Sequence, residues 1–129
     1  MPVIRSKYQS SQSLEEFYEF LVEQSEEWKI TKDSMLNLIN KLNEEFPDKT
    51  FYALTSHSRL VILKNEDTSS DWLVIFSSSE INEYRLDAML PNNKSIWKNA
   101  RITARVKGTD KAIDYFKLAL KNLETDKPK

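Results

Sequence analysis

Residues 35–56 read MLNLINKLNEEFPDKTFYALTS, and the spacing of their apolar residues changes at Pro47. Before the proline, apolar residues recur every three or four positions, which is typical of one face of a helix. After it the period becomes two, with Phe51, Ala53 and Thr55 on one face, which is typical of a strand. Proline disfavours helical backbone in the residue before it, so the helix is expected to end there. The change of period predicts helices followed by strands.

Another helix is predicted upstream of this stretch. Ser13 and Glu16 have the spacing of a capping box, in which each side chain accepts a hydrogen bond from the other residue's backbone N–H at a helix start. The apolar residues that follow are again spaced by three and four, namely Leu14, Phe17, Tyr18, Leu21, Val22 and Trp28. We expect a first helix over 13–28 and a second from Thr31 to Pro47. The short connection at 29–31 makes the two helices neighbours.

Five strands are predicted after Pro47, over residues 50–56, 59–64, 72–77, 81–90 and 97–107. The strand over 72–77 is apolar on both faces, so it is expected in the middle of the sheet. The last two strands form the clearest hairpin, because both alternate apolar and charged residues. Placing Asp87 opposite Arg101 also sets Glu83 opposite Arg105, and both cross-strand pairs are then favourable in charge.

The complete pattern predicts a single α+β domain over residues 1–129. A last helix is expected after Gly108, with Thr109 as its cap, which gives the order ααβββββα. The sheet should be antiparallel, with the helices packed on one face and charged side chains on the opposite face. Residues 1–12 form a loose arm or a short edge strand in this interpretation, and residues 124–129 a frayed tail.

The rarest residue types exclude several kinds of site. The chain has one Gly, one His and no Cys among 129 residues. A single Gly cannot build a glycine-rich phosphate loop, and a single His cannot build a two-histidine metal site. Without Cys there is no thiolate site and no disulfide. We therefore expect no cofactor, no bound metal and no catalytic activity.

No stretch of the sequence has the pattern of a membrane or export signal. The longest apolar run, residues 72–76, is far shorter than the roughly 20 residues that cross a bilayer. The first residues lack the basic start and apolar run of a secretory signal. A cytoplasmic location without membrane contact is expected.

Charge is distributed unevenly along the chain. Residues 1–48 carry ten acidic and five basic side chains, whereas residues 49–129 carry ten acidic and fourteen basic ones. Glutamates cover the polar side of the first helix with no base among them, and clustered acids speed the encounter with a basic protein. Trp97 lies beside a predicted loop, where an aromatic side chain can anchor an interface. The predicted partner-binding residues are Glu15, Glu16, Glu19, Glu23, Glu26 and Trp97.

One alternative is a small enzyme that needs no metal. His57 is the only side chain whose ordinary pKa lies near neutrality, and Arg59 and carboxylates such as Glu80 follow it in the sequence. Glu83 and Asp87 would share one strand face at a separation of about 13 Å, which is too wide for a pair of glycosidase carboxylates. Ion pairs with arginines on the next strand are the favoured interpretation of these acids.

A second alternative is binding of nucleic acid or another anion. Arg85, Arg101, Arg105 and Lys107 would share one face of the last hairpin, where they could contact phosphates. No aromatic residues are interleaved on that face, and the net charge of the chain is −1. Nucleic acid is therefore disfavoured as a partner.

The second half of the chain contains DWLVIFS at 71–77, EYRLDAMLP at 83–91, Trp97, and a strand, Gly108 and helix over 104–120. With this layout, residues 71–123 resemble small bacterial immunity proteins that neutralise polymorphic or contact-dependent toxins. It is a likeness of layout and size, without a catalytic motif. It implies a cytoplasmic, non-catalytic protein that binds and blocks a cognate toxin. The glutamates of the first helix would suit a basic partner surface, such as the cleft of a nuclease.

Overall fold

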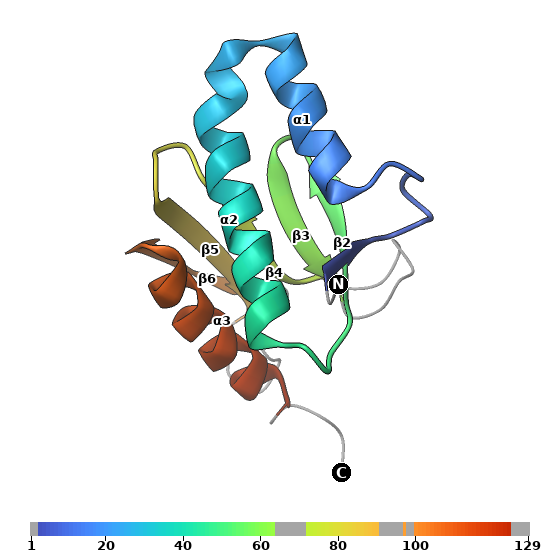
Figure 1. Ribbon diagram of the computed structural model, residues 1–129. Helices are drawn as coiled ribbons and strands as arrows, with labels where there is room; N and C mark the ends of the chain where they lie inside the picture. Colours follow the sequence, from blue (N-terminus) through green and yellow to red (C-terminus); the bar gives the residue numbers. More distant parts are fainter. Residues whose placement is uncertain (1–2, 64–71, 91–96, 98–99, 125–129) are drawn as a thin grey trace.

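A computed structural model describes residues 3–63, 72–90, 97 and 100–124 of the chain, and in these ranges it contains a six-stranded sheet with helices over one face (Figure 1). The strands lie in sequence order across the sheet. They are β1 (Val3–Arg5), β2 (Phe51–Ser56), β3 (Arg59–Leu63), β4 (Trp72–Ser77), β5 (Glu83–Met89) and β6 (Arg101–Lys107). The helices are α1 (Leu14–Gln24), α2 (Lys29–Glu45) and α3 (Thr109–Glu124), with a short 3₁₀ helix η1 (Glu26–Trp28) between α1 and α2.

The predicted α+β class is confirmed, and the predicted order is incomplete. Helices precede the main strands and a helix follows them, but β1 comes before α1. Strands β2 to β6 pair antiparallel, with β4 inside the sheet as expected, whereas β1 pairs parallel with β2. The predicted loops at 65–71 and 91–96 and the tail beyond Glu124 lie outside the described residues.

The N-terminal residues form an edge strand that is fixed on both sides. The backbone N–H of Val3 donates to Asn43 Oδ1 of α2 at 3.0 Å, and that of Ser6 donates to the carbonyl oxygen of Ala53 at 2.7 Å. The guanidinium of Arg5 donates to Thr55 Oγ1 at 2.8 Å. Of the two predicted alternatives for residues 1–12, the edge strand is the one that forms at Val3–Arg5.

Helix α1 begins as predicted and ends early. The Ser13–Glu16 capping box is present, with both hydrogen bonds formed. The predicted end at residue 28 is wrong, because Ser25 has extended backbone and its side chain accepts a hydrogen bond from the N–H of Glu27. Serine competes with the helix in this way by bonding its own local backbone. The chain turns through η1 and enters α2 at Lys29, two residues before the predicted start.

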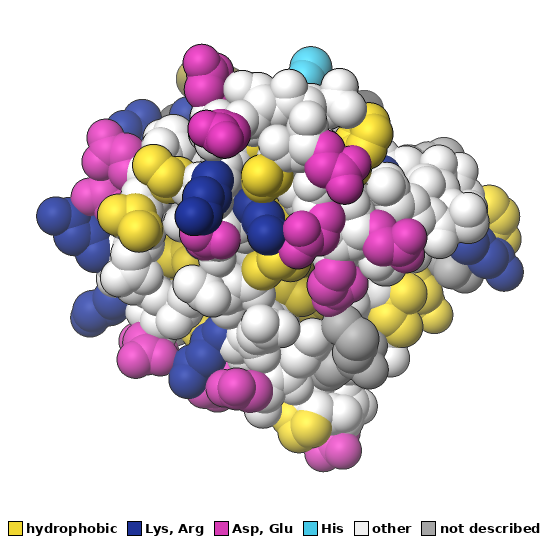
Figure 2. Space-filling model, turned by 45° about the horizontal axis from the view of Figure 1, so that its top comes forward, with side chains coloured by type: hydrophobic (Ala, Val, Ile, Leu, Met, Phe, Trp, Pro, Cys, Tyr) yellow, Lys and Arg dark blue, Asp and Glu magenta, His cyan; other side chains and the backbone are white. Residues whose placement is uncertain are grey.

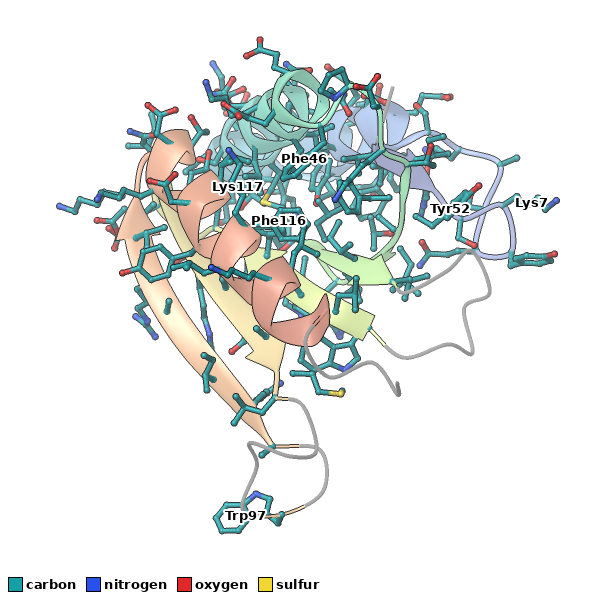
Figure 3. All side chains as sticks on the ribbon, turned by 90° about the horizontal axis from the view of Figure 1, so that it is seen from below. Lys7, Phe46, Tyr52, Trp97, Phe116 and Lys117 are labelled. Atoms are coloured by element: carbon teal, nitrogen blue, oxygen red, sulfur yellow. The ribbon has the colours of Figure 1, made fainter. Side chains whose placement is uncertain are left out.

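The core lies between the helices and the covered face of the sheet. The ring of Phe116 on α3 contacts Phe46, Phe51 and Phe76, with centroid separations of 5.7, 5.4 and 5.4 Å. Figure 3 shows Phe46 and Phe116 meeting between α2 and α3. The pairs with Phe46 and Phe51 are edge-to-face and the pair with Phe76 is tilted, and aromatic pairs of this kind stabilise the fold by about 0.5–1.5 kcal/mol each beyond the burial of their apolar area. The aromatic cluster joins both helices to the sheet.

The face of the sheet without helices is only partly charged, which corrects the prediction of a charged face. Val61, Leu63 and Ile75 form a second buried apolar cluster there, with Leu54 and Trp72 packed against it. Charged side chains on this face come mainly from β5 and β6, with Arg59 at the start of β3. The sequence did not predict this cluster, because β3 and β4 are apolar at nearly every position and their pattern does not distinguish the two faces of the sheet.

The register of the β5–β6 hairpin differs from the prediction by two residues. Arg101 lies opposite Met89 and Arg105 opposite Arg85. Asp87 therefore faces Thr103, and Glu83 faces Lys107. A shift of two leaves every side chain on the same face of the sheet, so the apolar pattern alone could not choose between the registers. Backbone hydrogen bonds at the two ends, from Gly108 N–H to Asn82 O and from Leu90 N–H to Ala100 O, hold the observed one.

Gly108 ends β6 as predicted, with a left-handed φ of 86°. Helical structure begins at Thr109 itself, so the residue before the helix is the glycine and not the threonine. The N–H of Ala112 donates back to the carbonyl oxygen of Gly108 at 3.2 Å. This turn lays α3 across β4, β5 and β6.

Candidate functional site

The predicted glutamates lie on one exposed surface. Glu16, Glu19 and Glu23 of α1 and Glu26 of η1 are exposed, and Glu15 is partly buried. The first helix itself carries no base, but the start of α2 supplies two: Lys29 is exposed, and Lys32 Nζ lies 3.1 Å from a carboxylate oxygen of Glu19. This surface is therefore strongly acidic with a single ion pair among its described residues.

Apolar side chains are exposed on the same surface, and sequence reasoning missed them. Phe20 on α1 is 46% exposed and Trp28 in η1 is 36% exposed, and Ile30 is exposed in the first turn of α2. Trp28 was predicted in the apolar stripe of the first helix, which ends before reaching it. Phe20 follows Phe17 by three residues, but around the helix it lies beyond Phe17, on the glutamate side of the apolar stripe, and this was the available signal. We call this surface, made by Glu15, Glu16, Glu19, Phe20, Glu23, Glu26, Trp28 and Ile30, the acidic corner.

The acidic corner is visible from the top of the molecule. In Figure 2, Asp and Glu side chains gather to the right of centre, over α1, with hydrophobic side chains beside them. Most isolated exposed apolar residues need no explanation. Exposed apolar side chains that are surrounded by carboxylates do need one, because an apolar centre with a charged rim is typical of a protein interface.

Trp97 is not part of this surface. Its side chain is 70% exposed, as expected for an anchor beside a loop. Figure 3 places it beyond the side of the sheet that the helices leave uncovered, away from α1. The structure therefore does not bring Trp97 together with the five predicted glutamates.

His57 and Arg59 do not converge on a site within the described residues. His57 lies exposed in the tight turn between β2 and β3, with a left-handed φ of 59°. Arg59 turns back toward Ser56, donating to its carbonyl oxygen at 3.5 Å and to its Oγ at 3.4 Å. The described residues place no hydrogen-bonding partner on the His57 ring.

Three of the four predicted basic residues line a cleft of about 480 Å³ at the end of the sheet. Arg85, Arg105 and Lys107 line it, together with Glu83 and serines from the neighbouring turns, while Arg101 lies toward the other end of β6. The charges in this cleft are mixed. Lys107 Nζ lies 3.5 Å from a carboxylate oxygen of Glu83.

Asp87 holds the guanidinium of Arg85 on the same face. Its two carboxylate oxygens lie 3.2 Å from Nε and 3.3 Å from Nη2 of the arginine. The Nε contact is a close ion pair without good hydrogen-bond alignment, since this buried atom has no aligned acceptor. Asp87 is 3% exposed and also accepts a hydrogen bond from Thr103 Oγ1. The predicted pairing of Glu83 and Asp87 with Arg105 and Arg101 is therefore wrong.

The carboxylates that do come together are Glu80 and Glu83. A hydrogen bond between their side chains and their mutual repulsion raise the pKa of Glu80 above its ordinary value, and nearby Lys107 opposes this. Both side chains lie at the surface, so solvent screens the interaction. No group of three or more His, Cys, Asp or Glu side chains in the described ranges could hold a metal ion.

None of the comparisons with protein-family models, curated proteins and solved structures gives a match for this chain. The resemblance to toxin-immunity proteins thus stays a prediction. Within the residues that the structure covers, no helix has both the length and the apolar character needed to cross a membrane.

Proposed function

We propose that this chain is a non-catalytic binding protein that docks its acidic corner onto a basic surface of a partner protein. The observation that carries the proposal is the exposure of Phe20 and Trp28 among the glutamates of α1 and η1. Aromatic side chains supply most of the energy in many interfaces. Surrounding acids steer a basic partner toward them and speed association.

We further propose that the partner is a toxin, and that the chain acts in the cytoplasm as an immunity protein. The resemblance of residues 71–123 to such proteins supports this step, together with a surface suited to a basic cleft. A nuclease presents such a cleft, because its substrate is an anion. Covering the cleft would block the enzyme without any chemistry by the inhibitor.

The test uses the product of the neighbouring gene as the partner. We expect the purified chain to bind it and to block its toxicity when the two are expressed together. The variant Glu19→Lys/Glu23→Lys should associate about tenfold more slowly, most visibly at low salt, where charges act over longer distances. Its matched control is Asp48→Lys/Asp114→Lys, which reverses two exposed acids outside the corner and makes the same change in net charge.

A second pair of variants tests the aromatic residues. Phe20→Ala/Trp28→Ala should dissociate faster by a factor of roughly 30 or more, because removing even one aromatic anchor that is buried at an interface costs about 2 kcal/mol or more. Tyr8→Ala/Ile81→Ala is the control, since both side chains are exposed outside the corner. Binding that changes equally in variants and controls would place the partner elsewhere. Toxicity that is never blocked would reject the immunity function.

A further inference from the structure

Strand β6 ends the described sheet and offers an open edge. The hydrogen bonds from Leu90 N–H to Ala100 O and from Gly108 N–H to Asn82 O show that even-numbered residues of this strand direct their backbone groups toward β5. Backbone groups alternate in direction along a strand, so those of Arg101, Thr103 and Arg105 point outward. No strand in the described residues pairs with this edge. Such a row of donors and acceptors is a template for another strand.

On the uncovered face of the sheet, β6 is basic. Arg101 and Arg105 are exposed there, and no carboxylate in the described ranges pairs with either. Their partners on β5 are Met89 and Arg85, so one arginine lacks a counter-charge and the other faces a like charge. Like charges directly opposite each other destabilise a strand pair. Acidic side chains on a strand added at the open edge of β6 would supply a counter-charge to both Arg101 and Arg105.

On the helix face, β6 borders an apolar groove of about 440 Å³ between α3 and the β5–β6 hairpin. Ile102 and Leu118 are each 56% exposed in it, and Tyr115 is exposed beside them. A strand added to the edge of β6 would place alternate side chains on the two faces of the sheet. One set would lie beside the arginines and the other set beside this groove.

On the inner edge of β6, β5 already pairs with it in this arrangement, with polar contacts on the uncovered face and apolar side chains on the helix face. Glu83 and Asp87 of β5 contact Lys107 and Thr103 on the uncovered face, while Tyr84 and Leu86 are buried on the helix face. A second copy of β6 would fit poorly, because an antiparallel pair centred on Ala104 sets Arg101 opposite Lys107. The charge pattern thus favours a different, acidic strand over self-association.

We propose that the open edge of β6 binds an extended segment of a partner protein in which acidic and apolar residues alternate. Its backbone pairs with the outward groups of Arg101, Thr103 and Arg105. Its acidic side chains lie opposite Arg101 and Arg105, and its apolar side chains lie beside Ile102, Tyr115 and Leu118. This inference does not rest on the function proposed for the acidic corner.

The probe is a synthetic peptide as long as β6 in which Glu and Val alternate. We expect it to bind the intact chain and to slow hydrogen exchange at the backbone amides of Thr103 and Arg105. The amide of Ala104 already faces β5 and should change little. A peptide of the same composition with its order shuffled is the control. Binding without protection of the outward amides, or equal binding of the shuffled peptide, would overturn the proposal.

Two variants test the two faces. Arg101→Glu/Arg105→Glu should weaken peptide binding about tenfold, because it turns two opposite-charge cross-strand pairs into like-charge pairs. Its control is Lys29→Glu/Lys49→Glu, which reverses exposed charges far from β6 in the sequence. Leu118→Ser, at an exposed position, should also weaken binding. If the double reversal fails to fold, Arg101→Gln/Arg105→Gln replaces it, with a smaller loss expected.

Nucleic acid is the competing occupant of the basic row. A single-stranded oligonucleotide that binds more tightly than the peptide, and loses affinity in the Arg101→Glu/Arg105→Glu variant, would overturn the proposal in favour of phosphate binding. Unchanged peptide affinity in both the arginine variant and Leu118→Ser would reject it outright.

Discussion

Tyr84 is buried beneath α2, where its hydroxyl donates to the carbonyl oxygen of Ser34 at 2.7 Å. Burial raises the pKa of Tyr84 from 10.0 to about 12. Tyr18 is a second buried phenol, whose hydroxyl donates to the carbonyl oxygen of Ser58 at 3.1 Å, and burial raises its pKa as well. Both hydroxyls tie the helix layer to backbone carbonyls, and both do so only while protonated.

The fold should therefore lose stability in alkali. A raised pKa in the folded state means that stability is fully present below the unfolded pKa of 10.0 and is lost as pH rises from there toward the folded value of about 12. Tyr84→Phe should cost about 1 kcal/mol near neutral pH through the lost hydrogen bond. The same variant should lose less stability on going to alkaline pH than the wild type does. Urea unfolding across that range measures both, and equal alkaline losses in the two proteins would contradict the assignment.

The burial of Asp87 could not be predicted from the alternating pattern of β5. The pattern places Asp87 on the same face as Glu83, and the sequence therefore predicted that both side chains face solvent. In the fold it lies in one row with Val61 and Ile75, next to the second apolar cluster, and Thr103 and Arg85 satisfy its oxygens. A carboxylate this buried must be paired, because an isolated buried charge is very costly.

At the scale of elements, the β5–β6 hairpin contains an unfavourable contact that can be removed. Arg85 and Arg105 are direct cross-strand partners. Arg105→Glu should stabilise the protein by about 0.5 kcal/mol, because an opposite-charge pair replaces a like-charge pair, and the ion pair between Asp87 and Arg85 keeps this gain small. Lys111→Glu on α3 is the control, as an exposed lysine with the same change in charge. Thermal unfolding decides the point, and a lower melting temperature in Arg105→Glu than in the control would count against the observed register.

Short-range patterns in the sequence were sufficient to predict most of the helices and strands. The capping box at Ser13, the stop at Pro47 and the alternation after it involve residues close together in the chain, and the structure has all of them. The end of α1 was missed because Ser25 interrupts a regular apolar spacing. Strand β1 was left open because three residues carry little pattern, and their partner Phe51 lies far along the chain.

The residues of the candidate sites likewise differ in whether local sequence is enough to predict them. Sequence alone located the glutamates of the acidic corner, because a run of acids on a helix needs no tertiary information. The exposed aromatic residues among them depend on where α1 stops and how η1 turns, and so they became visible only in the fold. The β6 edge likewise required the strand order, which no alternating pattern specifies.

At the scale of the whole molecule, the two proposed surfaces, the acidic corner and the edge of β6, are separated by the width of the sheet. Figure 1 shows α1 near β2 and β3, while α3 lies near β6, toward the opposite edge of the sheet. The strands run in sequence order, so β2, β3, β4 and β5 lie between the edge strands. A partner at the acidic corner and a strand at β6 would therefore not compete for the same residues.

This separation predicts that changes at the two surfaces add. Glu19→Lys/Glu23→Lys and Arg105→Glu share no partner: Lys32 contacts the first surface and Arg85 faces the second. Substitutions this far apart usually add within about 0.5 kcal/mol, and at about 0.15 M salt charges separated by more than about 8 Å are largely screened. The unfolding free energy of the combined variant should thus equal the sum of the separate effects. A coupling above about 1 kcal/mol would mean that the core transmits strain between α1 and β6, and the two surfaces would then have to be treated as one linked system.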